Sequence, residues 1–484
     1  MVERTFADLY CNGNLPVART TLLLKQNKES DWWTLWLGLR LGVLLVLLCW
    51  VLWDCIVDAV VVRPVPFDFF NEGVFRVYRG IGCLILAVWL WGINIYVWTS
   101  VRINFRYLFE MDADAVQGHA PVFMRATSLT LFFLINFLLF FKITRRDMGV
   151  SPKYRQYAPL VLTISTLLYM FWPATGKRVY VRGILRALSA PFSEVTFFSV
   201  FIADVMTSMV KVFSDLAYTA CYFGSGEWNA LALIANGTEE DGILPNADEL
   251  SKLDGYCANN RVLEKVVIPI ICILPLWLRL MQNLRRYKDT HKRFPFLANA
   301  LKYAAAQSVV VFSLFNPSLT KTAAKMDAQR VVWIFCFASS TLYTYAWDVR
   351  MDWGLCRRKN RAHGFFLRTR RMYSRRYVYY IAMVADLILR FVWTLSIIPT
   401  QQGNPFIPYL TTFLSPVIAA GELCRWGGGR ETREQRNEEK ERERERERDP
   451  EPLYHAIVCA NVCTVWLLDH SYSVRQTACA SSLT

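Results

Sequence analysis

The segment from Tyr379 to Pro399 reads YYIAMVADLILRFVWTLSIIP, an apolar run long enough to cross the roughly 30 Å of bilayer hydrocarbon as one helix. It carries Asp386 and Arg390 near its middle. Ions at this depth are costly unless they face a partner or a water-filled cavity, so they indicate either an ion route or a structural pair between packed helices. Because they are four residues apart, both side chains lie on one helical face and can pair.

Comparable apolar runs recur along the 484 residues, of which 54% are hydrophobic and 14% aromatic. This composition is too apolar for a soluble protein of that length, and the runs predict an all-α, polytopic membrane protein with ten transmembrane helices. The predicted spans are Trp32–Val57, Gly80–Val101, Ser128–Phe141, Tyr157–Trp172, Val195–Cys221, Val262–Leu284, Leu297–Phe315, Val331–Trp347, Tyr377–Ile398 and Ile407–Gly421.

The basic loops between the spans predict the orientation. Lys177–Arg186, Arg285–Arg293 and Arg350–Arg376 are expected in the cytosol, which with ten spans places both termini there. Lys142–Arg155 is also basic but falls on the opposite face, so the span count before the fifth helix is the least certain part of this topology. The net charge of +15 resides mainly in such loops, without a recognition motif, and we expect no nucleic-acid partner.

An acidic loop carries markers of the opposite face. Asn236-Gly-Thr is an acceptor sequence for N-glycosylation, which places this loop in the lumen or outside the cell. Cys221 and Cys257 flank the loop, where they form either a disulfide or two free thiols.

Composition divides the chain into four parts. Residues 1–31 form a short cytosolic segment without a cleavable signal peptide, so the first span is expected to act as the targeting signal. Residues 32–190 hold about four scaffold spans, and residues 191–426 hold six core spans. Residues 427–484 begin with an Arg/Glu run that cannot bury a core and is expected to be disordered.

Motifs for common enzyme chemistry are missing from the sequence. It contains no GxxxxGK[ST], GxGxxG, GxSxG or HExxH pattern, so we expect neither an enzyme nor a bound metal or cofactor. What remains is a set of ionisable residues in or beside the last six spans: Asp204, Lys302, Asp348, Asp352, Arg390 and Arg425. Arginine and lysine bind phosphate oxygens well, and nearby carboxylates lower the affinity to the moderate level that conduction requires. The alternative is that each acid only neutralises a base or caps a helix.

Five segments together resemble the EXS family, the membrane half of the eukaryotic phosphate exporters. They are FIADVMTS at 201–208, LWLRLMQNLRRYKDT at 276–290, FPFLANALKY at 294–303, WDVRMDWG at 347–354 and DLILRFVW at 386–393. Their order and spacing match the family from about Pro191 to Arg425.

The resemblance implies an inorganic phosphate pathway through the last six spans, with the first four as scaffold and as contact of a homodimer in the lipid membrane. Because the resemblance assigns the phosphate contact to Arg390, we interpret Asp386 as its helical counter-ion. The implied phosphate-facing or gating residues are Asp204, Thr207, Lys292, Lys302, Tyr303, Asp348, Asp352, Arg390, Trp393, Glu422 and Arg425.

Two departures from the family pattern refine this expectation. Only residues 1–31 precede the first span, where the exporters usually carry an SPX domain, so the chain is more similar to short Golgi members without that control. Arg425 is followed by Trp426 and glycines instead of a second arginine. We expect a passive phosphate transporter of the Golgi membrane, with the plasma membrane as the other location.

Two other functions are compatible with these residues. One is a sorting or retention scaffold of the Golgi, in which the intramembrane ions are purely structural. The other is a membrane transferase with a phosphorylated donor, in which Asp348 and Asp352 hold a divalent metal. Divalent-metal dependence separates the transferase from the transporter.

Overall fold

The computed structural model describes residues 30–54, 73–100, 118–171, 178–229, 255–316, 327–355 and 377–391, together with the single residues 8, 13, 109 and 367. Within these ranges the chain is helical and forms no strand. The helices are α3 (Ser30–Leu52), α5 (Gly73–Ser100), α7 (His119–Thr144), α8 (Tyr157–Phe171), α9 (Arg178–Leu188), α10 (Phe197–Ser208), α11 (Val210–Gly224), α14 (Ile268–Thr290), α15 (Phe296–Phe315), α16 (Ala328–Trp347) and α17 (Tyr377–Phe391). Short 3-10 or π-helical turns are η2 (Pro152–Tyr154), η4 (Leu263–Val267) and η6 (Asp348–Asp352).

The all-helical membrane fold agrees with the sequence, but the count of ten spans is not confirmed. Described helices lie in nine of the predicted segments, and the tenth, Ile407–Gly421, lies outside the described residues. Among the described residues, four helices are long and apolar enough to cross a bilayer, and the bent pair α10–α11 is a fifth if it counts as one span. The four are Thr34–Leu52, Gly73–Thr99, His119–Thr144 and Phe296–Phe315.

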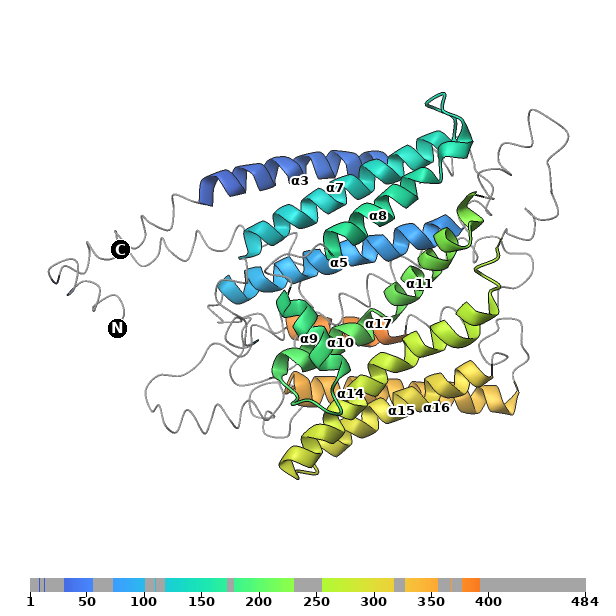
Figure 1. The fold of residues 1–484 in the computed structure, drawn as a ribbon. Coiled ribbons are helices and arrows are strands. Elements are labelled where there is room, and N and C mark those ends of the chain that lie inside the picture. Colours follow the sequence, from blue (N-terminus) through green and yellow to red (C-terminus); the bar gives the residue numbers. More distant parts are fainter. Residues whose placement is uncertain are drawn as a thin grey trace.

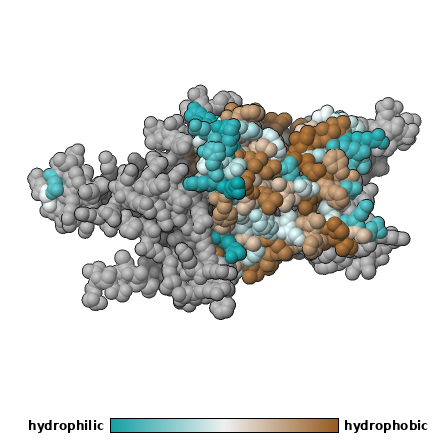
Figure 2. Space-filling model, turned by 90° about the horizontal axis from the view of Figure 1, so that it is seen from below, coloured by the Kyte–Doolittle hydropathy of each residue, from teal (hydrophilic) through white to brown (hydrophobic). Residues whose placement is uncertain are grey.

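The helices form two groups joined by a broken helix. In Figure 1, α3, α5, α7 and α8 lie in the upper part, α14, α15 and α16 lie below, and α10 and α11 lie between them. Contacts of α11 with α5, and of α10 with α14, connect the two groups. The face of the molecule seen in Figure 2 is apolar across the middle and polar toward both ends of the helices, as expected of a protein surrounded by lipid.

The fifth predicted span, Val195–Cys221, is wrong as a single helix. It consists of α10 and α11, which meet at Met209 with a bend of 65°. The side chains of Thr207 and Ser208 both donate to the backbone oxygen of Asp204, at 2.7 and 3.4 Å. Such hydroxyl-to-backbone bonds bend helices, and here they coincide with the break. Asp204 therefore lies in the last turns of a half-helix and not in the middle of a continuous span.

Helix α5 begins earlier than its apolar run indicated. It starts at Gly73 and not at Gly80, so that Arg79 lies within the helix, where its Nε donates to Asp215 Oδ2 of α11 at 2.7 Å. Its Nη2 contacts Asp215 Oδ1 at 2.6 Å. This paired fork neutralises the arginine that interrupted the run, and it joins the two groups of helices.

The segment that disagreed with the predicted orientation has local counter-ions. Lys142 Nζ lies 3.0 Å from Asp54 Oδ2 and 3.4 Å from Asp147 Oδ2. Pairing therefore offsets part of the basic charge of this loop.

Cys221 and Cys257 form a disulfide, the first of the two alternatives left open by the sequence. Beside it, Glu227 Oε2 accepts a hydrogen bond from the Cys257 backbone at 2.9 Å, and Glu227 Oε1 accepts one from Tyr218 at 3.4 Å. The disulfide closes the connection between α11 and η4, whose residues 230–254, including Asn236, lie outside the described residues.

Candidate functional site

Seven charged side chains are buried where α10, α14, α15, η6 and α17 meet. We call them the core ion cluster: Asp204, Arg279, Lys302, Asp348, Asp352, Asp386 and Arg390. Lys302 is only 1% exposed and Arg390 8%. Charges this deeply buried require partners or hydrogen bonds, because transfer from water is costly for each ion.

Asp204 and Arg279 form the first half of the cluster. Arg279 Nε lies 2.6 Å from Asp204 Oδ1 and 3.1 Å from the hydroxyl of Tyr303. The same Tyr303 hydroxyl donates to Asp204 Oδ1 at 3.2 Å. Three helices, α10, α14 and α15, are thus connected through one carboxylate oxygen and one phenol.

The spacing of polar residues on α14 explains how Arg279 is held. Gln282 and Asn283 follow it by three and four residues, which places all three on one helical face. Arg279 Nη1 donates to Gln282 Oε1 at 2.7 Å, and Gln282 Nε2 donates to the Ser199 backbone oxygen of α10 at 3.1 Å. Asn299 of α15 donates to Asn283 Oδ1 at 2.9 Å. The Arg279 guanidinium is therefore oriented by its own helix, α14, which is hydrogen-bonded to α10 and to α15.

Asp348 is the centre of the second half. Its Oδ1 lies 3.4 Å from Lys302 Nζ, and its Oδ2 is in close contact with Arg390 Nη2. Arg390 Nε pairs with Asp386 Oδ2 at 2.9 Å, one helical turn earlier on α17. The two carboxylates thus bind different donors of the same guanidinium.

Lys302 and Tyr303 join the two halves. They are consecutive on α15, and while Tyr303 contacts Asp204 and Arg279, Lys302 contacts Asp348. The Lys302 ammonium lies 4.7 Å from the centre of the Tyr303 ring and 5.7 Å from that of Trp347. Aromatic faces stabilise a cation that has been removed from water.

Asp348 and Asp352 are both buried and belong to the π-helical turn η6, which follows α16 directly. Single π-helical turns are frequent at functional sites, because the wider turn changes the direction of side chains. Here the turn brings Asp348 to Lys302 and Arg390.

A small cavity adjoins the cluster. Its volume is about 30 Å³, and its lining includes Arg279, Arg286, Asn299 and Asp352. A cavity of this size exceeds the roughly 10–15 Å³ that one water molecule requires. Asn299 Oδ1 is buried there without a hydrogen-bond partner among the described residues. Polar lining and available space make this cavity suitable for water or a small anion.

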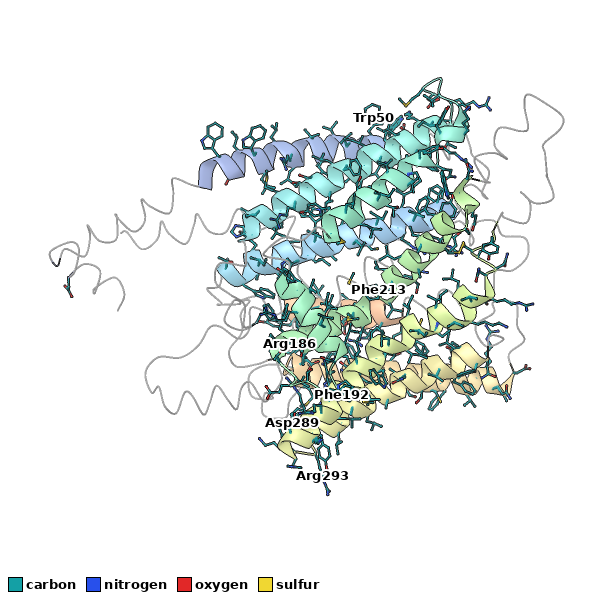
Figure 3. The ribbon with its side chains drawn as sticks, viewed as in Figure 1. Trp50, Arg186, Phe192, Phe213, Asp289 and Arg293 are labelled. Atoms are coloured by element: carbon teal, nitrogen blue, oxygen red, sulfur yellow. A yellow bond between two sulfur atoms is a disulfide. The ribbon has the colours of Figure 1, made fainter. Side chains whose placement is uncertain are left out.

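Asp289 and Arg293 lie at one end of the helix bundle (Figure 3). Arg286 precedes Asp289 by one turn of α14, and Pro295 of the lining follows Arg293 closely in the chain. The cavity therefore lies toward this end of the bundle, next to Arg279.

Two other residues implied by the resemblance are described and lie outside the core ion cluster. Thr207 bonds the Asp204 backbone, and Lys292 is exposed in the connection between α14 and α15. Trp393, Glu422, Arg425 and the sequon residue Asn236 lie outside the described residues.

Arg279 is the residue that sequence reasoning missed, together with Gln282 and Asn283. A signal was present, because an arginine within an apolar run is as costly as Arg390 in its own span. The i, i+3, i+4 spacing of the three polar residues also indicated one polar face.

The geometry suits reversible anion binding. Among the described residues, the cluster combines three cations with four carboxylates, so its formal charge is −1 when every group is ionised. An incoming anion must therefore displace a carboxylate from a cation. No group of three or more His, Cys, Asp or Glu residues that could hold a metal occurs in the described part of the chain, and Asp348 is paired with Lys302 and Arg390 instead.

Comparison with curated proteins gives several similar chains. "SPX and EXS domain-containing protein 1" of Dictyostelium discoideum is 32% identical over 433 residues, which are 88% of this chain and 43% of that protein. "Solute carrier family 53 member 1" of Homo sapiens is 30% identical over 417 residues, 84% of this chain and 56% of the human protein. "Xenotropic and polytropic retrovirus receptor 1 homolog" of Xenopus laevis is 31% identical over 336 residues, 67% of this chain and 45% of that protein.

The chain spans about half the length of these relatives. The EXS family model matches residues 74–427, which include every member of the core ion cluster. The resemblance seen in the sequence motifs is thereby confirmed: this integral membrane protein belongs to the EXS family.

Proposed function

We propose that this protein moves inorganic phosphate across a membrane, with the core ion cluster as the binding site. The observation that carries this proposal is the sharing of Asp348 by Lys302 and Arg390. Two cations that converge on one carboxylate from different helices match a tetrahedral anion, whose oxygens several donors can bind at once. The human relative is named a solute carrier, which is compatible with transport.

Binding then proceeds by exchange of anions. Phosphate replaces Asp348 on Lys302 Nζ and Arg390 Nη2, while Asp386 keeps Arg390 Nε in place. The return of Asp348 releases the phosphate, so the site never leaves two buried cations without an anion. This exchange provides the moderate affinity that conduction requires.

The Asp204–Arg279–Tyr303 group forms the adjacent station. It lies beside the cavity and is connected to Lys302 through the α15 backbone. Phosphate entering near Arg286 meets Arg279 first and Lys302 next, down its concentration gradient and without ATP. The break at Met209 contributes irregular backbone next to the site, as in transporters whose broken helices surround a substrate.

We further propose a Golgi location and a homodimer formed through α3. The location carries forward the expectation from the family resemblance in the sequence. The dimer rests on α3 itself, which packs against α7 but leaves Trp36, Leu39 and Leu45 exposed. Gly38 and Gly42 have open space beside them and form the small-xxx-small pattern that favours helix pairing in membranes.

Radiolabelled phosphate efflux from proteoliposomes tests transport. We expect efflux that needs neither ATP nor divalent metal. Excess unlabelled phosphate should reduce this efflux more strongly than sulfate does. If vesicles containing the protein retain phosphate to the same extent as protein-free vesicles, the result would instead favour the sorting scaffold.

A further inference from the structure

The amphipathic helix α9 has three distinct faces. Successive residues are turned by about 100°, so Gly183 and Ala187 share one face. Val181, Ile184, Leu185 and Leu188 occupy a second face, and Arg182 and Arg186 a third. The first face is buried, whereas the apolar second face and the arginines are exposed. Sequence reasoning treated this segment only as part of a basic loop.

The buried face is fixed on α10. A side-chain carbon at Gly183 would lie 2.3 Å from Phe198 Cε1 and 2.6 Å from Ile202 Cδ1, so only glycine allows this approach. α10 carries Asp204, which pairs with Arg279 in the core ion cluster. α9 is therefore held in one rotation about its axis, against the helix that presents Asp204.

The other two faces need two different surroundings. Leu185 is 60% exposed and Phe192, four residues beyond the end of the helix, is 87% exposed, which is unfavourable in water. Figure 3 places Arg186 and Phe192 toward the same end of the bundle as Asp289 and Arg293. At this end the bilayer offers hydrocarbon for apolar side chains and phosphate headgroups for arginines, and an interfacial helix combines both.

We propose that α9 lies in the interfacial layer of one leaflet and binds the headgroups of anionic phospholipids through Arg182 and Arg186. Its apolar face enters the acyl region, and its glycine face rests on α10. Arginine favours phosphate and carboxylate groups, so a headgroup with net negative charge binds more tightly than a zwitterionic one. The bound lipid thereby contacts α9, which packs on α10, the helix that precedes the 65° break.

Photo-crosslinking of the full chain in vesicles tests the binding. Photoactivatable phosphatidylserine and phosphatidylcholine are compared, and adducts are mapped by mass spectrometry. We expect phosphatidylserine adducts on residues 178–193 at several times the yield of phosphatidylcholine adducts. The double variant Arg182→Gln/Arg186→Gln should lose this preference. Arg182→Lys/Arg186→Lys should keep most of it, as should the control Arg285→Gln/Arg293→Gln, which removes two arginines at the same end of the bundle.

Equal labelling by the two lipids, or an unchanged preference in the Arg182→Gln/Arg186→Gln variant, would overturn the proposal. A second readout rests on the proposed phosphate transport: efflux should rise with phosphatidylserine content in the unmodified protein, and rise less in that variant. If no vesicle shows efflux, transport is contradicted, while the crosslinks still decide whether α9 binds anionic lipid.

Discussion

Lys302 of α15 and Arg390 of α17 reach the same carboxylate, Asp348, through its two oxygens. Neither residue is near the other in the sequence, and their convergence defines the centre of the proposed phosphate site. Asp386 pairs with a different nitrogen of the Arg390 guanidinium, Nε. The two carboxylates therefore have different roles: Asp386 orients the guanidinium, and Asp348 competes with the transported anion.

Asp348→Asn removes this competition. We expect phosphate to bind about tenfold more tightly, equivalent to about 1.4 kcal/mol, and maximal efflux to fall because release becomes slower. The uncompensated cations should also lower the thermal unfolding midpoint, and phosphate should restore it because it binds only the folded state. Binding isotherms and thermal melts with and without phosphate measure both effects. Asp289→Asn, on the exposed end of α14, is the control, and identical affinities in the two variants would argue against anion exchange.

Tyr303→Phe keeps the aromatic ring beside Lys302 but removes the hydroxyl between Asp204 and Arg279. One hydrogen bond of this kind contributes about 0.5–1.5 kcal/mol, or more when a charged group takes part. We expect efflux at low phosphate concentration to fall several-fold, with protein yield nearly unchanged. Tyr343→Phe, which removes a bond to the Ala298 backbone at an exposed site, should have little effect on efflux. Equal efflux from both variants would show that the first station is not used.

Arg79→Gln separates a structural ion pair from the transport site. Asp215 would lose its paired fork and remain buried between α5 and α11. Breaking a buried pair in this way costs roughly 3–5 kcal/mol, so we expect a clearly lower thermal midpoint. The phosphate concentration for half-maximal efflux should stay unchanged in the protein that folds. A shift in that concentration would instead connect this pair to the phosphate pathway.

Cys257→Ser opens the connection between α11 and η4. The two cysteines are 36 residues apart, and closing a loop of this size contributes about 2–4 kcal/mol by restricting the unfolded chain. We expect a lower unfolding temperature for the variant, and the same decrease for the unmodified protein after reduction. Reduction should not lower the unfolding temperature of the variant further; a second decrease would mean that another disulfide contributes.

The apolar runs predicted the helical class and most helix positions, because membrane spans require long apolar stretches. They failed where polar residues are satisfied by tertiary contacts. Arg79 made α5 appear to begin at Gly80, and hydroxyl bonds to the Asp204 backbone broke the fifth span. These partners are distant in sequence or depend on local geometry that hydropathy does not report.

The site was predictable in its residue types but not in its connections. Asp204, Lys302, Asp348 and Arg390 were identified as ions that a membrane interior tolerates only with partners, and all four are in the cluster. Asp348 is shared by residues of α15 and α17, which lie far from it in the sequence, and hydropathy does not predict such contacts. Arg279 was not singled out, although its partners Asp204 and Tyr303 lie on two other helices.

The central claim is that Arg390 binds the transported phosphate, and efflux of radiolabelled phosphate from proteoliposomes containing Arg390→Ala tests it most directly. Arg285→Ala, which removes an arginine paired with Asp289 on a partly exposed surface, is the matched control. With equal amounts of inserted protein, we expect efflux from Arg390→Ala to fall to the level of protein-free vesicles and efflux from Arg285→Ala to remain. Equal phosphate efflux from both variants would contradict the account.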